Sequence, residues 1–279
     1  MSQVADLHAH STASDGINPP AEVVRLAAGA GLAAIALTDH DTVNGVAEAR
    51  AEGEALGIRV ISGCEFSVLG DWGEMHLLAY GMPEGHAELE ATFRRMRTNR
   101  DDRGRAMVAA IVKCGIPIDY AEVEGAAAGA PIGRPHVARV LVKRGVVRTI
   151  DEAFVRFLGR GKPGYVGKVL PTLEEITDLI RRVGGVSSLA HPRDRATRAT
   201  LQSFQARGLD GVEVRHPSHS PSVRTELEQV ARGLGLLMTG GSDSHGEVSP
   251  SATHNLVGGE RIPIEWVDAI ETLAASRRS

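Results

Sequence analysis

Residues 6–16 read Asp-Leu-His-Ala-His-Ser-Thr-Ala-Ser-Asp-Gly, with two histidines separated by a single residue. Apolar and polar residues alternate through the first half of this stretch, which predicts a half-buried strand. On such a strand His8 and His10 point to the same face, where both can bind one ion. The turn residues that follow can bring Asp15 back over the strand end. Two such histidines also occur on strands that bind no metal, so the motif alone does not establish a metal site.

The composition indicates a folded protein. Of 279 residues, 42% are hydrophobic, which is enough for a core. Cys64 and Cys114 stand alone, so they indicate neither a disulfide framework nor a zinc finger. The sequence shows no signal-peptide pattern and no apolar run that could cross a bilayer, so we expect a cytoplasmic protein with no membrane partner and no obligate protein partner. A net charge of -4 argues against general attraction to nucleic acid.

Strand and helix patterns alternate along most of the chain. Short apolar runs predict strands over residues 4–10, 33–38, 59–62, 75–80, 186–190, 211–214 and 236–239. Amphipathic patterns predict helices over residues 19–30, 43–56, 84–114, 173–183, 197–206, 224–233 and 264–275. Asp41 is a plausible N-cap of the second helix. The alternation indicates an α/β protein with a parallel sheet, and about seven units favour a closed barrel over an open sheet.

Histidines and carboxylates collect at the ends of these strands. They are His8, His10, Asp15, His40, Glu65, His191, Asp243 and His245, with His76 on a strand. In a barrel the carboxyl ends of parallel strands meet at one face, so we expect these side chains to converge there. Core packing does not require such a pattern, and the convergence predicts a metal site. Imidazole and carboxylate without thiolate suit Mn²⁺, Fe²⁺ or Zn²⁺.

These motifs resemble those of the PHP (polymerase and histidinol phosphatase) metallophosphoesterases. The matching segments are Asp6-Leu7-His8-Ala9-His10, Thr38-Asp39-His40-Asp41, Gly63-Cys64-Glu65, His76, His191-Pro192 and Asp243-Ser244-His245. The resemblance implies a distorted barrel of seven βα units. Within the family, the chain most resembles the branch that hydrolyses nucleoside 3',5'-bisphosphates and, in related members, trims short RNA from its 5' end. This finer likeness rests on Ser14-Asp15-Gly16, Ile132-Gly133-Arg134-Pro135-His136 and Gly159-Arg160-Gly161-Lys162-Pro163-Gly164-Tyr165.

The resemblance also implies two or three divalent ions. The first would be held by His8, His10, Glu65 and Asp243. Glu65 would bridge to a second ion on His76 and His191, and the third would lie on Asp15, His40 and His245. A carboxylate at position 15 favours manganese, with zinc or iron as the alternatives.

Three further positions near these motifs have two interpretations each. Asp6 and Asp39 can accept the second N–H of a ligating histidine, or they can serve in a turn or a cap. The Gly240-Gly241 pair can permit a close approach of the backbone beside the ions, or it can be an ordinary flexible turn.

Clustered divalent ions can deprotonate a water, bind phosphoryl oxygens and stabilise the leaving oxygen. The sequence accordingly shows no nucleophile elbow, Walker loop or dinucleotide fingerprint. We therefore expect a phosphoesterase that uses a metal-bound hydroxide, with amide hydrolysis as the less favoured chemistry. The residues that we expect to take part in catalysis are His191, Asp243, His219 and Arg193. Arg193 can also clamp phosphate, and His219 can contact phosphate or protonate the leaving oxygen.

The middle of the chain departs from the repeating pattern. We expect residues 100–168 to form an inserted, mainly helical subdomain, with the barrel built from residues 1–99 and 169–279. Residues 134–168 include nine Lys or Arg and only two acidic residues. This charge favours a lid that binds a phosphate of the substrate, although part of it can be a solvated helix face. The candidate substrate-binding residues in its loops are Arg134, His136, Arg160, Lys162 and Tyr165.

The preferred hypothesis is removal of the 3'-phosphate of a nucleoside 3',5'-bisphosphate, with 5'-3' exoribonuclease action on short oligonucleotides as an extension. The substrate is then a nucleotide or a short RNA. Histidinol-phosphate phosphatase, or another small phosphomonoesterase, is one alternative, and the large basic insert argues against it. A non-catalytic PHP regulatory module is the other, and the complete ligand set argues against that.

Overall fold

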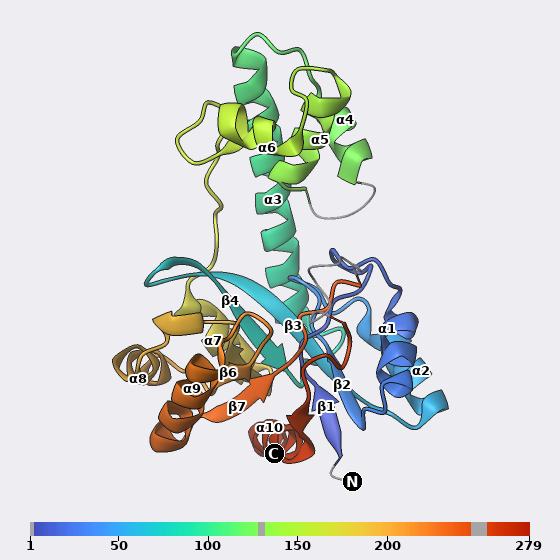
Figure 1. Ribbon diagram of the computed structural model, residues 1–279, viewed down its shortest axis with the longest axis vertical. Coiled ribbons are helices and arrows are strands. Elements are labelled where there is room, and N and C mark those ends of the chain that lie inside the picture. The colour runs from blue at the N-terminus through green and yellow to red at the C-terminus, as the bar shows by residue number, and fades with distance from the viewer. Residues whose placement is uncertain (1–2, 128–131, 247–255) are drawn as a thin grey trace. The chain divides into compact units, whose positions relative to one another are not determined.

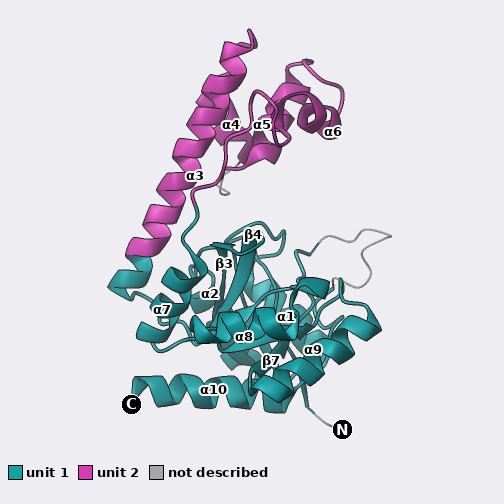
Figure 2. Ribbon diagram, turned by 90° about the vertical axis from the view of Figure 1, so that its left-hand side faces the viewer, with its two compact units in different colours: residues 1–90, 170–279 teal, residues 91–169 magenta. Residues whose placement is uncertain are grey.

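The computed structural model describes residues 3–127, 132–246 and 256–279. The chain divides into two compact units, residues 1–90 with 170–279, and residues 91–169 (Figure 2). The first boundary lies within a continuous helix, α3 (Ala87–Lys113). It comes nine residues before the boundary that was expected at residue 100. Among the described residues, no helix has the length and apolar character needed to cross a membrane.

In the described part of the first unit, eight strands form one sheet in the order β7-β6-β5-β4-β3-β2-β1-β8 (Figure 1). Their bounds are β1 (Val4–Asp6), β2 (Ala34–Leu37), β3 (Arg59–Gly70), β4 (Gly73–Tyr80), β5 (Val186–Leu189), β6 (Gly211–Arg215), β7 (Leu237–Gly240) and β8 (Ile262–Pro263). Just beyond β1, the N–H of Leu7 donates to the carbonyl of Gly240 at 3.0 Å, and Ala9 forms a parallel bridge with Ser244. These bonds join β1 to β7 and nearly close the sheet. The predicted α/β barrel is confirmed.

The expectation of an all-parallel sheet is wrong. β3 pairs antiparallel with β4, β4 with β5, and β1 with β8. Only Asp71 and Trp72 separate β3 from β4, and so short a connection can join only antiparallel strands. β3 also continues to Gly70, well past its predicted end at residue 62, because it pairs with β4 along its whole outer half.

Helices follow most strands, as the alternation predicts. In the barrel unit they are α1 (Pro20–Gly29), α2 (Val46–Leu56), α7 (Leu173–Arg182), α8 (Arg198–Ala206), α9 (Pro221–Leu234) and α10 (Ile264–Arg278). The N-cap role expected for Asp41 is wrong, because α2 begins at Val46 behind Gly45. The carboxylate of Asp41 instead accepts a hydrogen bond from the N–H of Ser67 at 2.9 Å, which ties the loop after β2 to β3.

Both units have apolar cores of their own. In the barrel, small and branched side chains such as Ala36, Leu78 and Val186 pack beneath the strand ends. The second unit contains the greater part of α3, α4 (Tyr120–Ala127), α5 (Arg134–Lys143), α6 (Ile150–Ala153) and a π-turn (Phe154–Leu158). Its core includes the fully buried side chains of Met107, Ile111 and Leu141. The basic charge of this unit is therefore carried on a folded helical body.

Candidate metal centre

The carboxyl ends of the strands are the most strained part of the backbone. Among the described residues, four that are not glycine have a positive φ: Asp41 (52°), His191 (29°), Arg193 (57°) and Asp243 (52°). All four lie just after β2, β5 or β7. Such conformations are disfavoured for residues with a side chain and persist only where the surroundings impose them, which is common at functional sites.

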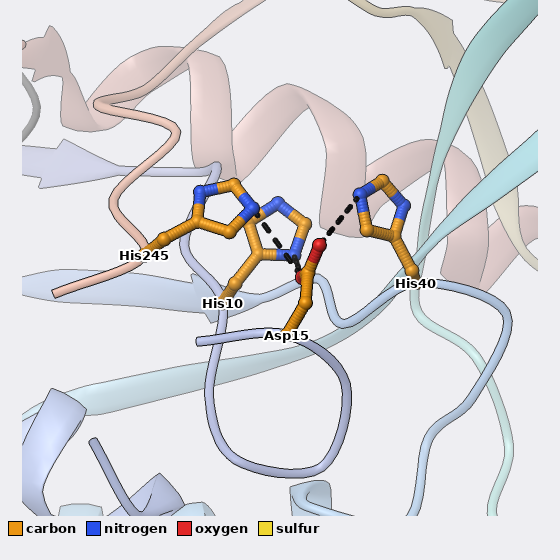
Figure 3. A group of neighbouring side chains, drawn as sticks. All are labelled: His10, Asp15, His40 and His245. Atoms are coloured by element: carbon orange, nitrogen blue, oxygen red, sulfur yellow. Dashed lines mark ion pairs between the residues drawn. The ribbon is translucent and has the colours of Figure 1, made fainter. Parts of the chain in front are cut away.

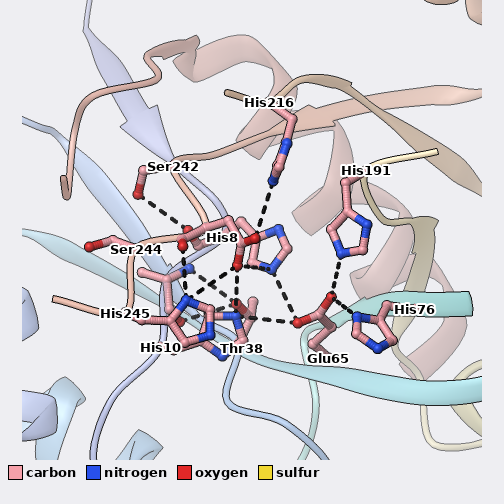
Figure 4. Close-up of polar contacts among 12 residues, drawn as sticks. His8, His10, Thr38, Glu65, His76, His191, His216, Ser242, Ser244 and His245 are labelled. Atoms are coloured by element: carbon pink, nitrogen blue, oxygen red, sulfur yellow. Dashed lines mark hydrogen bonds and ion pairs between the residues drawn. The ribbon is translucent and has the colours of Figure 1, made fainter. Parts of the chain in front are cut away.

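Four donor atoms meet at the centre of this face. Nε2 of His8 lies 3.3 Å from Oε2 of Glu65 and 3.3 Å from Oδ1 of Asp243 (Figure 4). Nε2 of His10 lies 3.3 Å and 3.2 Å from the same two oxygens. All four donor atoms lie within 4.8 Å of one another, close enough for one ion to contact all of them. These four residues are the set expected for the first ion.

The other oxygen of Glu65 faces a second pair of imidazoles. Nδ1 of His76 and Nε2 of His191 both lie 2.9 Å from Oε1 (Figure 4). His76 comes from β4 and His191 from the loop after β5. Glu65 is almost completely buried, at 1% exposure, and it separates the two groups with one oxygen turned to each. A carboxylate placed in this way would be able to contact an ion in each of the two groups.

A third group surrounds Asp15, which the turn after β1 carries back over the strand end (Figure 3). Its Oδ1 lies 3.3 Å from Nε2 of His245 and 3.8 Å from Nδ1 of His10, and its Oδ2 lies 3.8 Å from Nε2 of His40. His40 also reaches Glu65, with Nδ1 3.2 Å from Oε2. The set expected for a third ion is therefore assembled, with His10 as an additional member.

The unpaired polar atoms of the protein concentrate in these groups. Among the described residues, five buried side-chain nitrogen or oxygen atoms lack a hydrogen-bond partner, and four of them are ring nitrogens of His8, His10 and His40. Buried nitrogens are rarely left without a partner unless something else binds them. The donor set, its spacing and these free nitrogens together fit a centre for more than one divalent ion.

Charge in the centre is balanced between the rings and the carboxylates. Burial lowers the pKa of His8, but Asp243, Glu213 and Glu65 outweigh this and hold it well above its usual value. Burial raises the pKa of Glu65, but the neighbouring imidazoles, His40 foremost, lower it well below its usual range. Without an ion, protons therefore supply the positive charge that the carboxylates require.

Asp6 and Asp39 take the turn roles. Oδ1 of Asp6 accepts the N–H groups of His8 at 3.2 Å and Ser242 at 2.9 Å. Asp39 accepts the N–H of Ser11 at 2.8 Å and the hydroxyls of Ser11 and Ser14 at 2.7 and 2.6 Å. Neither contacts an imidazole in the described hydrogen bonds, so each fixes the backbone of a loop and orients no ring.

Glu213 and His216 are members of the centre that the sequence analysis did not assign to it. Glu213, on β6, is fully buried, and its Oε1 lies 3.0 Å from Nδ1 of His8. Nε2 of His216 lies 3.3 Å from Oδ2 of Asp243. The available signal was a single acid within the apolar run of residues 211–214, which is unusual in a buried strand.

The hydrogen bonds of His219 do not suit the expected role in contacting phosphate or protonating the leaving oxygen. Its Nδ1 donates to the carbonyl of Val214 at 3.0 Å, and its Nε2 accepts the N–H of Arg193 at 3.1 Å. Burial lowers its pKa. The ring is therefore neutral, only 3% exposed, and occupied at both nitrogens by backbone groups, which leaves neither for a phosphate or a leaving oxygen.

A pocket of about 390 Å³ opens beside the second pair of imidazoles. Its lining includes Trp72, Glu74, His76, His191, Arg193 and Arg195. No carboxylate partner is found for the side chain of Arg193 or Arg195 in the described part of the chain, whereas many other arginines form ion pairs. Two unneutralised guanidinium groups at a pocket next to a metal centre suit an anionic ligand.

The expected substrate-binding residues of the second unit have mixed surroundings. Nδ1 of His136 accepts the N–H of Gly133 at 3.0 Å and so caps α5. The guanidinium of Arg134 lies 5.5 Å from the ring centre of Phe154 and 5.6 Å from that of Tyr165. Arg160 and Lys162 are exposed. Arg134 and His136 therefore have structural contacts already, while Arg160 and Lys162 remain open to solvent.

Comparison with known proteins gives the same picture. Residues 6–115 match the PHP domain. The chain is 36% identical over 251 residues to a 3',5'-nucleoside bisphosphate phosphatase from Chromobacterium violaceum, covering 86% of each, and 32% identical over 250 residues to a 5'-3' exoribonuclease from Haemophilus influenzae, covering 88% of this chain and 91% of that one. A structure from Bifidobacterium adolescentis, described as a metal-dependent phosphoesterase, aligns with a TM-score of 0.81 at 30% identity over 98% of this chain and 97% of that one. This chain belongs to the PHP-domain family of metal-dependent phosphoesterases.

Proposed function

We propose that this protein removes the 3'-phosphate of nucleoside 3',5'-bisphosphates. The observation that carries the proposal is the three-part donor cluster around Glu65, beside a pocket lined by Arg193 and Arg195, whose guanidinium groups have no carboxylate partner among the described residues. The likeness to a bisphosphate phosphatase, at 36% identity over most of both chains, supports this choice of substrate class.

The residues that would hold two or three ions are His8, His10, Asp15, His40, Glu65, His76, His191, Asp243 and His245. Manganese is the favoured metal, since a carboxylate occupies position 15. Divalent ions held there would activate water and neutralise the charge of the phosphoryl group. Glu65 would keep two of them at a fixed separation, because one of its oxygens faces each donor set.

Residues around the metal centre would bind the parts of the substrate that do not react. Arg193 and Arg195 would attract the second phosphate of the substrate into the pocket. Arg160 and Lys162 of the second unit are the other candidates for that phosphate. Trp72 would offer its ring to the base or sugar. These assignments agree with a substrate that carries two phosphate groups better than with a small monophosphate.

The test is hydrolysis by the Mn²⁺-loaded protein, measured as release of phosphate from the monoesters and as release of mononucleotides from the dinucleotide. Adenosine 3',5'-bisphosphate, histidinol phosphate, AMP and a 5'-phosphorylated RNA dinucleotide are compared at equal concentration. We expect the bisphosphate to be the preferred substrate. Preference for histidinol phosphate would overturn the proposal in favour of a small-molecule phosphatase, and four intact substrates with bound metal would favour the regulatory module.

Exoribonuclease action on short RNA is the second candidate, because the exoribonuclease relative matches 88% of this chain. In a nucleoside 3',5'-bisphosphate, and in the first nucleotide of a 5'-phosphorylated RNA, the 3' and the 5' oxygen of the ribose both carry a phosphate. Release of mononucleotides from the 5'-phosphorylated dinucleotide would support this activity. A dinucleotide that stays intact while the bisphosphate is hydrolysed would limit the protein to mononucleotides.

A further inference from the structure

Residues 191–193 form a turn that the backbone does not favour. His191 and Arg193, on either side of Pro192, both have positive φ angles, 29° and 57°. Glycine adopts this region freely, and residues with a side chain do so only under constraint. Both residues face the metal centre or its pocket, so the constraint also determines where their side chains lie.

Two side chains from β6 and the loop after it supply that constraint. Oε2 of Glu213 accepts the N–H of His191 at 2.6 Å, and Nε2 of His219 accepts the N–H of Arg193 at 3.1 Å. His219 is itself fixed through Val214 of the same strand. The two N–H groups on either side of Pro192 are therefore both bound to acceptors that β6 holds in place.

Glu213 reaches the first donor set as well. Its second oxygen, Oε1, lies 3.0 Å from Nδ1 of His8, while Nε2 of that ring faces Glu65 and Asp243. A carboxylate on one ring nitrogen keeps the proton there and leaves the lone pair of the other nitrogen for a metal. One carboxylate thus orients a ring of the first set and the backbone of a residue in the second.

We propose that Glu213 is a positioning residue that sets the two donor groups of the metal centre at the same time, and that His219 positions the second group alone. The proposal rests on the metal centre and is independent of the substrate. Metal binding can therefore support or refute it even where the substrate assignment fails.

Replacing Glu213 by Gln separates its two contacts. A carboxylate accepts hydrogen bonds from both donors, whereas an amide has one oxygen to accept with and one nitrogen that donates. In Glu213→Gln either the N–H of His191 loses its acceptor, or the proton of His8 is driven to the nitrogen that faces the ions. Loss of an outer carboxylate partner typically lowers metal affinity about 10–100-fold.

The matched control is Asp210→Asn, at the residue just before β6. Asp210 is also a carboxylate that links β6 to β5, since it accepts the N–H of Ser187 at 2.9 Å and pairs with Arg277 at 2.8 Å. It lies outside all the donor groups. Its replacement should lower the thermal stability of the fold and leave Mn²⁺ affinity unchanged, as any purely structural role would.

The experiment measures bound Mn²⁺ per chain at controlled free Mn²⁺, together with the unfolding temperature of the metal-free protein. We expect Glu213→Gln to bind Mn²⁺ about 10–100-fold more weakly. Wild-type affinity in Glu213→Gln, with a fall in unfolding temperature like that of Asp210→Asn, would overturn the proposal.

If Glu213→Gln does not fold, the variant His219→Phe provides a second test of the proposal. Phenylalanine fills a similar space but cannot accept the N–H of Arg193. We expect this variant to lose one ion, from His76 and His191, and to retain the ion on His8 and His10. Unchanged metal content, or loss of every ion, would contradict the assignment.

Discussion

Nε2 of His191 lies 2.9 Å from Oε1 of Glu65, although 126 residues separate the two in the chain. The contact exists because β3 and β5 both border β4, so Glu65 on β3 and His191 in the loop after β5 lie on either side of the strand that carries His76. The barrel thus converts separate motifs into one site, and most of the ring positions that define it are set by backbone pairing.

The first prediction concerns His191→Ala. The side chain lies at a strand end and is 27% exposed, so its removal should leave the core and the fold intact. It should also remove a donor from the second ion, and we expect phosphate release to fall by at least about 100-fold, beyond the loss typical of an outer partner. Phosphate release and bound metal per chain are measured together.

His86→Ala is the control for that experiment. His86 is a histidine of the same unit that lies outside every donor group. Its activity and metal content should match those of the wild type. Full activity in His191→Ala would show that the second donor set has no part in the reaction.

Much of this site could be predicted because its residues follow strands. His40, His191 and Asp243 end apolar runs, and the barrel brings such ends together. Glu213 gave a weaker signal, since nothing in a single acid on a strand reveals which partners it will meet. His219 was misjudged because its role depends on two backbone groups, and a sequence does not show which carbonyl or N–H will lie beside a ring.

The antiparallel hairpin of β3 and β4 was missed for a related reason. The prediction ended β3 at residue 62, just before the Gly63-Cys64-Glu65 motif, although apolar and polar residues alternate beyond it through Phe66 and Val68. Pairing over the whole outer half of the hairpin provides the energy that keeps β3 extended to Gly70.

The second prediction concerns protons in the metal-free centre. Burial lowers the pKa of His10 from its ordinary 6.5, but the nearby carboxylates of Asp243 and Glu65 raise it to about 9. Burial acts likewise on His76, and Glu65 raises its pKa to about 10. Manganese must displace these protons, so its affinity should increase between pH 6.5 and about 9. Calorimetry in two buffers of different ionisation enthalpy measures the protons released.

The same two pKa values set the third prediction, on stability. His10 and His76 bind protons more tightly in the folded protein than in the unfolded chain, where the pKa is 6.5. Their contribution to the free energy of unfolding is complete below pH 6.5 and is lost as the pH rises through about 9 for His10 and about 10 for His76. Metal-free protein in EDTA should therefore unfold at lower temperature at pH 9 than at pH 6.5. A rising unfolding temperature over this interval would contradict the assignment.

The fourth prediction compares the two proposed positions of the second phosphate. If the barrel pocket binds it, Arg195→Ala should raise KM for adenosine 3',5'-bisphosphate about 10-fold, the effect of losing one charged hydrogen bond, with kcat little changed. KM for 3'-AMP, which lacks that phosphate, should stay the same. If the second unit binds it, Lys162→Ala should show this pattern instead. Arg232→Ala, at an exposed ion pair on α9, is the control.

The last prediction concerns Gly241, which lies between the end of β7 and Asp243. A Cβ atom there would lie 2.3 Å from the backbone nitrogen of His8 and 2.6 Å from Oδ1 of Asp6, so the backbone has to move if one is added. Gly241→Ala should lower the free energy of unfolding by more than about 2 kcal/mol, as overpacking in a rigid core does. It should also weaken Mn²⁺ binding, because Asp6 holds the N–H of Ser242 and thereby places Asp243. Gly29→Ala is the control: its Cβ meets nothing within 4 Å at the end of α1, and we expect a small gain in stability from reduced freedom of the unfolded chain. If Gly241→Ala were as stable as Gly29→Ala and bound Mn²⁺ normally, the pair at 240 and 241 would be an ordinary turn, and the close approach would have no part in building the metal centre.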